Sequence, residues 1–229
     1  QQIQNNKYRA NIQVNATFIS KERNDTNTIT HNYFSATYDT PKLIDKENFY
    51  DLLRIPLLKG KYQMDLEIVD KNANNKPILY TDVLDLTFDN NIVCLSSIQP
   101  LSYLSRAENH NRYIKEGWDY TPYFSTYYPE IVNSFTFWVE IYHSDKINSK
   151  SDSFIVYSAI VAAENPQTPV FKLSKQKIFN KKSQVSMQQI YNIDSLPSGN
   201  YYLVLEIRDE NDTIHAYSSY FFQRYNPIS

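Results

Sequence analysis

Two pairs of carboxylates recur in this chain at one spacing, and they are the first residues to test for chemistry. Glu67 and Asp70 lie in the stretch 57–72, and Glu206 and Asp209 lie in 196–211, 139 positions later (199 − 60). A carboxylate can act as a general acid or base, and an Asp-x-Asn sequence resembles the start of a calcium loop. Each Glu lies opposite core-facing leucines on a predicted strand, so a solvent-facing position explains it better. Each Asp ends its strand, where we expect it to accept backbone N–H bonds. The remaining ligands of a calcium loop are missing in both copies, so we expect no metal site.

The other reactive side chains are scattered. The four histidines, His31, His110, His143 and His215, are isolated from one another, and no metalloprotease, nucleophile-elbow, phosphate-loop or dinucleotide motif occurs. The single cysteine, Cys94, has apolar neighbours that would not activate a thiolate, so we interpret it as a small buried residue. We therefore expect no catalytic residues, no cofactor and no enzymatic activity.

A dense aromatic cluster is the remaining candidate for function. Its members lie in the middle of the chain: Tyr113, Trp118, Tyr120, Tyr123, Phe124, Tyr127 and Tyr128. Trp138 follows on a predicted strand at 134–143, whose two faces are both bulky. Three interpretations stand beside each other: packing between two domains, a protein-partner surface rich in the residues that dominate interfaces, or a platform on which sugars stack.

Composition limits the partners. The formal net charge is −2, from 23 Lys and Arg against 25 Asp and Glu, so nothing favours a nucleic-acid partner. No run of 18 apolar residues is present, so we expect no membrane span. The first residue is Gln1 rather than Met, so either a tag was removed or a signal peptide was cleaved; the second alternative favours export.

The apolar residues predict strands that must position these side chains. Residues 8–18 alternate between apolar and polar with a period of two, and further short segments of strand character are separated by polar turns. No segment carries the spacing of an amphipathic helix. We predict an all-β protein made of two tandem immunoglobulin-like or fibronectin-like β-sandwiches, with domain 1 at 1–90 and domain 2 at 91–229. Within domain 2, residues 91–102 are predicted as the first strand and residues 103–120 as a long loop.

The repeated stretch supplies the main structural prediction. Gly60 and Gly199 each stand between extended segments, where we expect a positive φ that costs glycine nothing. Tyr62 and Tyr201 follow two residues later. A tyrosine at the start of a strand after a corner is typical of the tyrosine corner, in which its hydroxyl binds a nearby backbone carbonyl.

The second half of the chain also resembles a known family. Leu196-Pro197-Ser198-Gly199-Asn200-Tyr201, Leu205-Glu206-Ile207-Arg208-Asp209 and Phe221-Phe222-Gln223-Arg224 are similar to the region ahead of the helical domain in GWxTD-domain proteins, which are exported envelope proteins of gram-negative bacteria. The similarity extends over residues 50–228, more loosely in domain 1. The helical GWxTD domain itself is absent, and Gly117-Trp118-Asp119-Tyr120 is not that motif, so the chain is either a shortened form or a short relative.

Taken together, these observations predict a non-catalytic structural or protein-interaction module of an exported envelope protein, located in the periplasm or at the outer-membrane surface. Its expected partner is another envelope protein, contacted through the aromatic residues named above. The alternative is a glycan-binding module that uses exposed Trp and Tyr residues.

Overall fold

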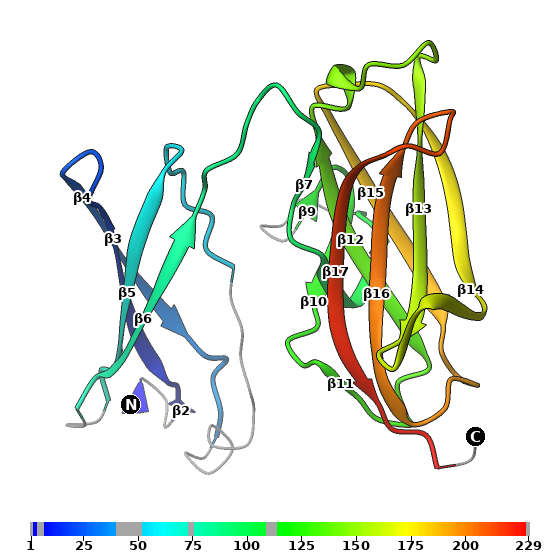
Figure 1. The fold of residues 1–229 in the computed structure, drawn as a ribbon. Helices are drawn as coiled ribbons and strands as arrows, with labels where there is room; N and C mark the ends of the chain where they lie inside the picture. The colour runs from blue at the N-terminus through cyan, green and yellow to red at the C-terminus, as the bar shows by residue number, and fades with distance from the viewer. Residues whose placement is uncertain (1, 4–6, 40–51, 73–75, 109–113, 228–229) are drawn as a thin grey trace. The chain divides into compact units, whose positions relative to one another are not determined.

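The computed structural model describes residues 2–3, 7–39, 52–72, 76–108 and 114–227. These residues form β-strands and one short 3₁₀ helix, η2 (Ser144–Lys146), so the predicted all-β class is confirmed (Figure 1). Among them, no helix has the length and apolar character needed to cross a membrane. The chain divides into two compact units, Gln1–Phe88 and Asp89–Ser229, where the sequence predicted a boundary after residue 90.

The first unit contains a four-stranded antiparallel sheet in the order β4-β3-β5-β6. The strands are β3 (Asn11–Ser20), β4 (Asp25–Phe34), β5 (Lys61–Asp70) and β6 (Ile78–Asp85), and β1 (Gln2–Ile3) pairs with β2 (Lys7–Tyr8) beside them. One face of the sheet buries Ala16, Phe18 and Tyr62, against which Ile55 and Leu57 pack from the segment before β5. The period-two alternation of β3 produces this face, because alternate side chains of a strand point to the same side.

The second unit is a sandwich of two sheets (Figure 1). One sheet has the order β15-β12-β8-β10-β9, with β7 also paired to β12, and the other has the order β11-β17-β16-β13-β14. The core between them takes residues from both sheets, including Phe135, Val156, Leu203 and Phe222, all fully buried. The strands are β7 (Cys94–Leu95), β8 (Gln99–Arg106), β9 (Ile114–Lys115), β10 (Trp118–Pro122), β11 (Tyr127–Tyr128), β12 (Ser134–Tyr142), β13 (Ser153–Ala162), β14 (Asn165–Asn180), β15 (Gln184–Asn192), β16 (Gly199–Arg208) and β17 (Ile214–Arg224).

The predicted long loop at 103–120 is wrong. Strand β8 continues to Arg106 and pairs with β10, and β9 and β10 form a tight hairpin within the same span. Its turn is Glu116-Gly117, with φ of 51° and 77°, which is the geometry that two-residue hairpin turns require. The sequence did not indicate these strands because residues 105–117 are mostly polar and β9 is only two residues long. The single strand predicted at 91–102 is likewise two strands, β7 and β8, and Cys94 on β7 is half-buried rather than buried.

The repeated turn forms a tyrosine corner in both units, as predicted. Tyr62 Oη donates to the carbonyl of Leu58 at 2.7 Å, and Tyr201 Oη donates to the carbonyl of Pro197 at 3.0 Å, each four residues back along the chain. Both rings are buried. The predicted role of glycine is confirmed only for Gly60, whose φ is +145°.

The prediction of a positive φ at Gly199 is wrong. Gly199 begins β16 with a backbone conformation that residues other than glycine can also adopt, and its lack of a side chain is what the turn requires. A Cβ added there would lie 3.3 Å from the ring of Tyr201, so the missing side chain leaves room for the corner tyrosine to fold back over the turn.

Candidate functional site

Three of the predicted aromatic residues form a packed cluster on one sheet of the second unit. Trp138 of β12 is 2% exposed and stacks on Tyr120 of β10, with ring centroids 6.1 Å apart. Trp118 packs against the pair, and the guanidinium of Arg106 covers its ring at 4.0 Å. The bulky second face of β12 is therefore covered, and Trp138 and Tyr120, two of the predicted partner-binding residues, are both buried in this cluster.

A charged pair borders this cluster. Lys115 Nζ lies 2.6 Å from Glu140 Oε1, and Tyr142 Oη donates to Glu140 Oε2 at 2.5 Å. Burial opposes the ionisation of Glu140, but the hydrogen bonds from Lys115 and Tyr142 outweigh it and lower its pKa. Burial and the nearby Glu140 raise the pKa of Tyr142. Glu140 is thus held as an anion at neutral pH, which does not suit a general acid.

An open groove of about 530 Å³ lies beside this pair and holds two more of the predicted residues. Tyr123 is half-buried and Phe124 is 71% exposed. The groove combines an exposed ring, a fixed ion pair and small polar groups. Its lining consists of Ser96, Ser97, Ile98, Gln99, Pro100, Lys115, Pro122, Tyr123, Phe124, Trp138 and Glu140.

The loop from β10 to β12 carries the most exposed apolar side chains of this region. Phe124 is 71% exposed, Tyr127 is 46% and Ile131 is 88%. We call these three residues the loop patch. Sequence reasoning named Phe124 and Tyr127 but missed Ile131, which lies between Pro129 and Asn133 in a turn where an apolar side chain can remain exposed. Tyr113, also predicted, lies outside the described residues.

Buried contacts hold the backbone of this loop in place. Arg224 of β17 is 3% exposed, and its Nη1 donates to the carbonyls of Pro129 at 2.7 Å and Val132 at 2.6 Å. Tyr128 is 1% exposed and packs against Phe222 with ring centroids 5.3 Å apart. Strand β11 pairs in parallel with β17. The loop patch is therefore presented on a fixed backbone.

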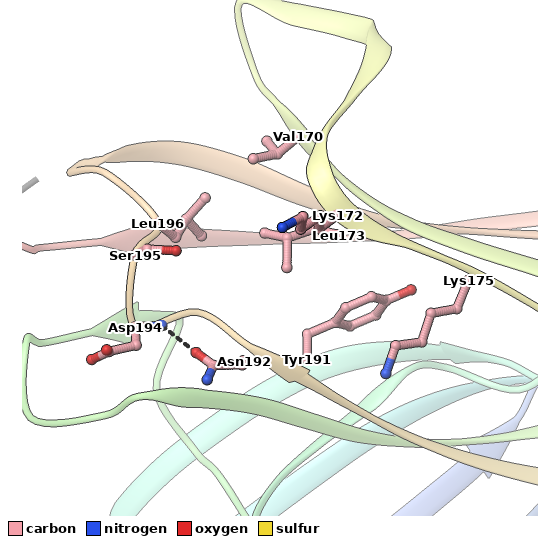
Figure 2. A pocket seen from close by; sticks show the side chains of 9 residues that line it. All are labelled: Val170, Lys172, Leu173, Lys175, Tyr191, Asn192, Asp194, Ser195 and Leu196. Carbon is pink, nitrogen blue, oxygen red and sulfur yellow. Dashed lines mark hydrogen bonds between the residues drawn. The ribbon is translucent and has the colours of Figure 1, made fainter.

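A second hollow lies between β14 and the turn after β15 (Figure 2). Its volume is about 580 Å³, and its lining consists of Val170, Lys172, Leu173, Lys175, Tyr191, Asn192, Asp194, Ser195 and Leu196. Two of its polar side chains make hydrogen bonds within the fold. Lys175 Nζ donates to the carbonyl of Ile190 at 2.9 Å, and Asn192 Oδ1 accepts the N–H of Asp194 at 2.8 Å. Burial raises the pKa of Tyr191 to about 12, and its hydroxyl donates to Ser158. Nothing in the sequence indicated this hollow.

The recurring carboxylates are structural, as predicted for each Asp. Asp70 Oδ1 accepts the N–H of Asn72 at 2.8 Å, and Asp209 Oδ1 accepts the N–H of Asn211 at 2.8 Å. Asp209 also binds His215 Nε2 at 2.9 Å, and this contact, with the backbone N–H groups, lowers its pKa to about 2.

The two Glu residues, predicted to face solvent, are half-buried and have polar partners on the same or the neighbouring strand. Glu67 accepts a hydrogen bond from Asn15 Nδ2 at 2.6 Å, and Glu206 accepts one from Arg208 Nε at 2.7 Å. Among the described residues, no group of three or more His, Cys, Asp or Glu side chains is placed to hold a metal ion.

Comparisons with known proteins add little. No protein-family model matches the chain. No curated protein matches it either. One similar solved structure is described as "Crystal structure of putative beta-galactosidase from bacteroides fragilis"; it is 8% identical, with a TM-score of 0.33, over 95% of this chain and 30% of that one. This chain thus spans less than a third of that protein's length, and a likeness of this degree supports no conclusion about activity.

Proposed function

We propose that this chain is a non-catalytic protein-interaction module of an exported bacterial envelope protein, and that the loop patch binds the partner. The observation that carries the proposal is the exposure of Phe124, Tyr127 and Ile131 on a backbone fixed by Arg224 and Tyr128. Exposed aromatic side chains supply most of the energy in many interfaces. A loop that is already ordered loses little conformational entropy when it binds, so more of that energy appears as affinity.

The cellular setting in this proposal comes from the sequence. The similarity to the region ahead of the helical domain in GWxTD-domain proteins supports export and an envelope partner. A partner that fits the patch presents an apolar surface with a shallow hollow for Ile131, which is the most exposed of the three side chains.

The test compares two variants of the full chain. Phe124→Ser with Ile131→Ser removes two thirds of the loop patch, while Ile178→Ser with Ile214→Ser removes two exposed isoleucines from strands β14 and β17. Each chain is used to capture a partner from envelope extracts, and the captured protein is then purified and titrated. We expect the first variant to raise the Kd by at least about tenfold, since each hot-spot residue contributes ~1 kcal/mol or more. The second variant should bind like the unmodified chain. Equal affinity for all three chains would refute the loop patch as the binding site.

Glycan binding in the groove beside Lys115 and Glu140 is a second candidate. The groove supplies what sugar recognition needs, an exposed aromatic ring at Phe124 next to a fixed ion pair. The buried Trp138 cannot serve as the stacking ring, contrary to the sequence prediction. Titration with a broad glycan panel tests this second candidate. Glycan binding that is lost in Phe124→Ala and retained in Phe124→Tyr supports glycan recognition in the groove, and the absence of binding to every glycan refutes it.

A further inference from the structure

Strand β6 forms one edge of the sheet in the first unit and is apolar on both faces. Leu79 and Val83 are 72% and 71% exposed on one face, and Ile78 and Tyr80 are 67% and 51% exposed on the other. Among the described residues, β6 pairs only with β5. The opposite edge, β4, reads Asp-Thr-Asn-Thr-Ile-Thr-His-Asn-Tyr-Phe and is mainly polar. Natural sheets usually protect exposed edges with charges, and β6 has two, Asp82 and Asp85. Its four exposed apolar side chains nevertheless make it the edge of this sheet that favours a partner strand.

The register of the sheet shows which backbone groups of β6 are available. The N–H of Leu86 donates to the carbonyl of Gly60, so residues with even numbers on β6 direct their backbone groups toward β5. Because these directions alternate along a strand, the N–H and C=O groups of Leu79, Thr81 and Val83 point away from the sheet. A partner strand would bond to these groups.

We propose that β6 pairs antiparallel with β6 of a second copy, with Thr81 opposite Thr81 of the second copy, to make one continuous sheet from two first units. In this register Leu79 faces Val83 of the second copy, and Ile78 faces Leu84 of the second copy. About six backbone hydrogen bonds form, two for each directly bonded pair. The apolar side chains on both faces of one strand thereby pack against those of the other.

Other registers are less favourable. A shift by one residue would place outward-pointing backbone groups against inward-pointing ones and is excluded. A shift by two residues in one direction places Asp82 opposite Asp82 of the second copy, where like charges repel. The same shift in the other direction carries Val83 and Leu84 beyond the end of the partner strand. In the proposed register Asp82 faces Tyr80 of the second copy, whose hydroxyl is a suitable donor.

Asp82 also competes with this pairing. Its Oδ1 accepts the N–H of Val83 at 2.7 Å, and its Oδ2 accepts the hydroxyl of Tyr80 at 2.8 Å. The first of these bonds occupies one of the outward-pointing N–H groups, so it must open before β6 pairs fully. Opening this bond costs part of the free energy of pairing, so we expect a reversible dimer rather than a permanent one.

The first test measures the mass of the full chain by sedimentation equilibrium over a range of concentrations. We expect a monomer–dimer equilibrium, and Val83→Lys should raise its dissociation constant by at least about tenfold by placing an ammonium group at the pairing edge. Thr26→Lys makes an equivalent change on β4 and should leave the equilibrium unaltered. Circular dichroism confirms that both variants remain folded. A monomer at every concentration, or equal effects of the two lysines, overturns the proposal.

The second test reports the register. In a Cys94→Ser background, Thr81→Cys should form an intermolecular disulfide under mild oxidation, because directly opposite residues have Cα atoms about 5.5 Å apart. Thr26→Cys in the same background is the matched control: it keeps β6 and its equilibrium, but it should form no intermolecular disulfide. Cross-linking of Thr81→Cys no faster than that of Thr26→Cys refutes the proposed register. Because these residues lie outside the loop patch, the outcome is independent of the proposed function.

Discussion

The tyrosine corner of the second unit should stabilise it by an amount that can be calculated from its contacts. Tyr201 is buried, and its hydroxyl donates to the carbonyl of Pro197 at 3.0 Å. Tyr201→Phe removes this bond and keeps the ring. A net hydrogen bond contributes about 1 kcal/mol, and a buried carbonyl left without a donor can cost up to about 3 kcal/mol. Pro197 is exposed, so water can replace the lost donor and the smaller figure applies. We expect a loss of ~1 kcal/mol, equivalent to ~3 °C in Tm for a unit of this size.

Differential scanning calorimetry of the full chain measures this shift, and hydrogen exchange assigns each transition to a unit. Tyr217→Phe is the control, since Tyr217 is 58% exposed on neighbouring strand β17. Tyr62→Phe should lower the stability of the first unit by a similar or larger amount, because Tyr62 Oη also accepts a hydrogen bond from Arg23. A shift for Tyr201→Phe no greater than that for Tyr217→Phe would show that the corner bond contributes nothing, and a loss above ~3 kcal/mol would show that the carbonyl is not rescued by water.

Three further predictions follow from individual contacts. Gly60→Ala should destabilise the first unit by ~1–3 kcal/mol in urea unfolding, because the backbone φ of +145° at Gly60 is strained for any residue with a side chain. Gly199→Ala should destabilise the second unit by less, since the added Cβ requires only that a 3.3 Å contact with the ring of Tyr201 relax. The pKa of Asp209 is lowered to about 2 in the folded protein, so its contribution to stability is fully present above the unfolded pKa near 3.9 and is lost as the pH falls toward 2. Asp209→Asn should therefore flatten the dependence of the unfolding free energy on pH in this range, as measured by urea unfolding. An unchanged dependence on acid pH would contradict this role of Asp209. Arg224→Met should increase protease cleavage in the loop 129–132 and weaken partner binding, and unchanged cleavage would exclude Arg224 as the anchor.

Much of the fold was predictable because its signals are local. Alternation located β3, and the recurrence of Gly, Tyr and Asp at one spacing predicted both corners and the turns that follow them. The long loop was predicted wrongly because β9 is only two residues long and residues 105–117 are mostly polar, although β10 itself alternates as Trp118-Asp119-Tyr120-Thr121. A positive φ at Gly199 was predicted by analogy with Gly60, but the two glycines have different roles. Gly60 adopts a backbone conformation that other residues rarely adopt, whereas Gly199 leaves space for the ring of Tyr201.

The candidate site was predictable only in part. Composition identified an aromatic-rich segment, but it could not separate Trp138, which is buried by its neighbours across the sheet, from Phe124, which is exposed. That distinction depends on which strands pair, and β12 pairs with β8 and β15 from distant parts of the chain. Arg224 was missed for the same reason, because its two carbonyl partners lie more than 90 residues away.

The parallel pairing of β11 with β17 has a mechanical consequence. Both strands run in the same direction, and the guanidinium of Arg224 adds two bonds at the end of this contact. Tension applied along β17 toward its C-terminal end would load these bonds together in shear, instead of breaking them one after another. The loop patch is thus coupled to β17, and this contact would fail at a threshold force rather than gradually.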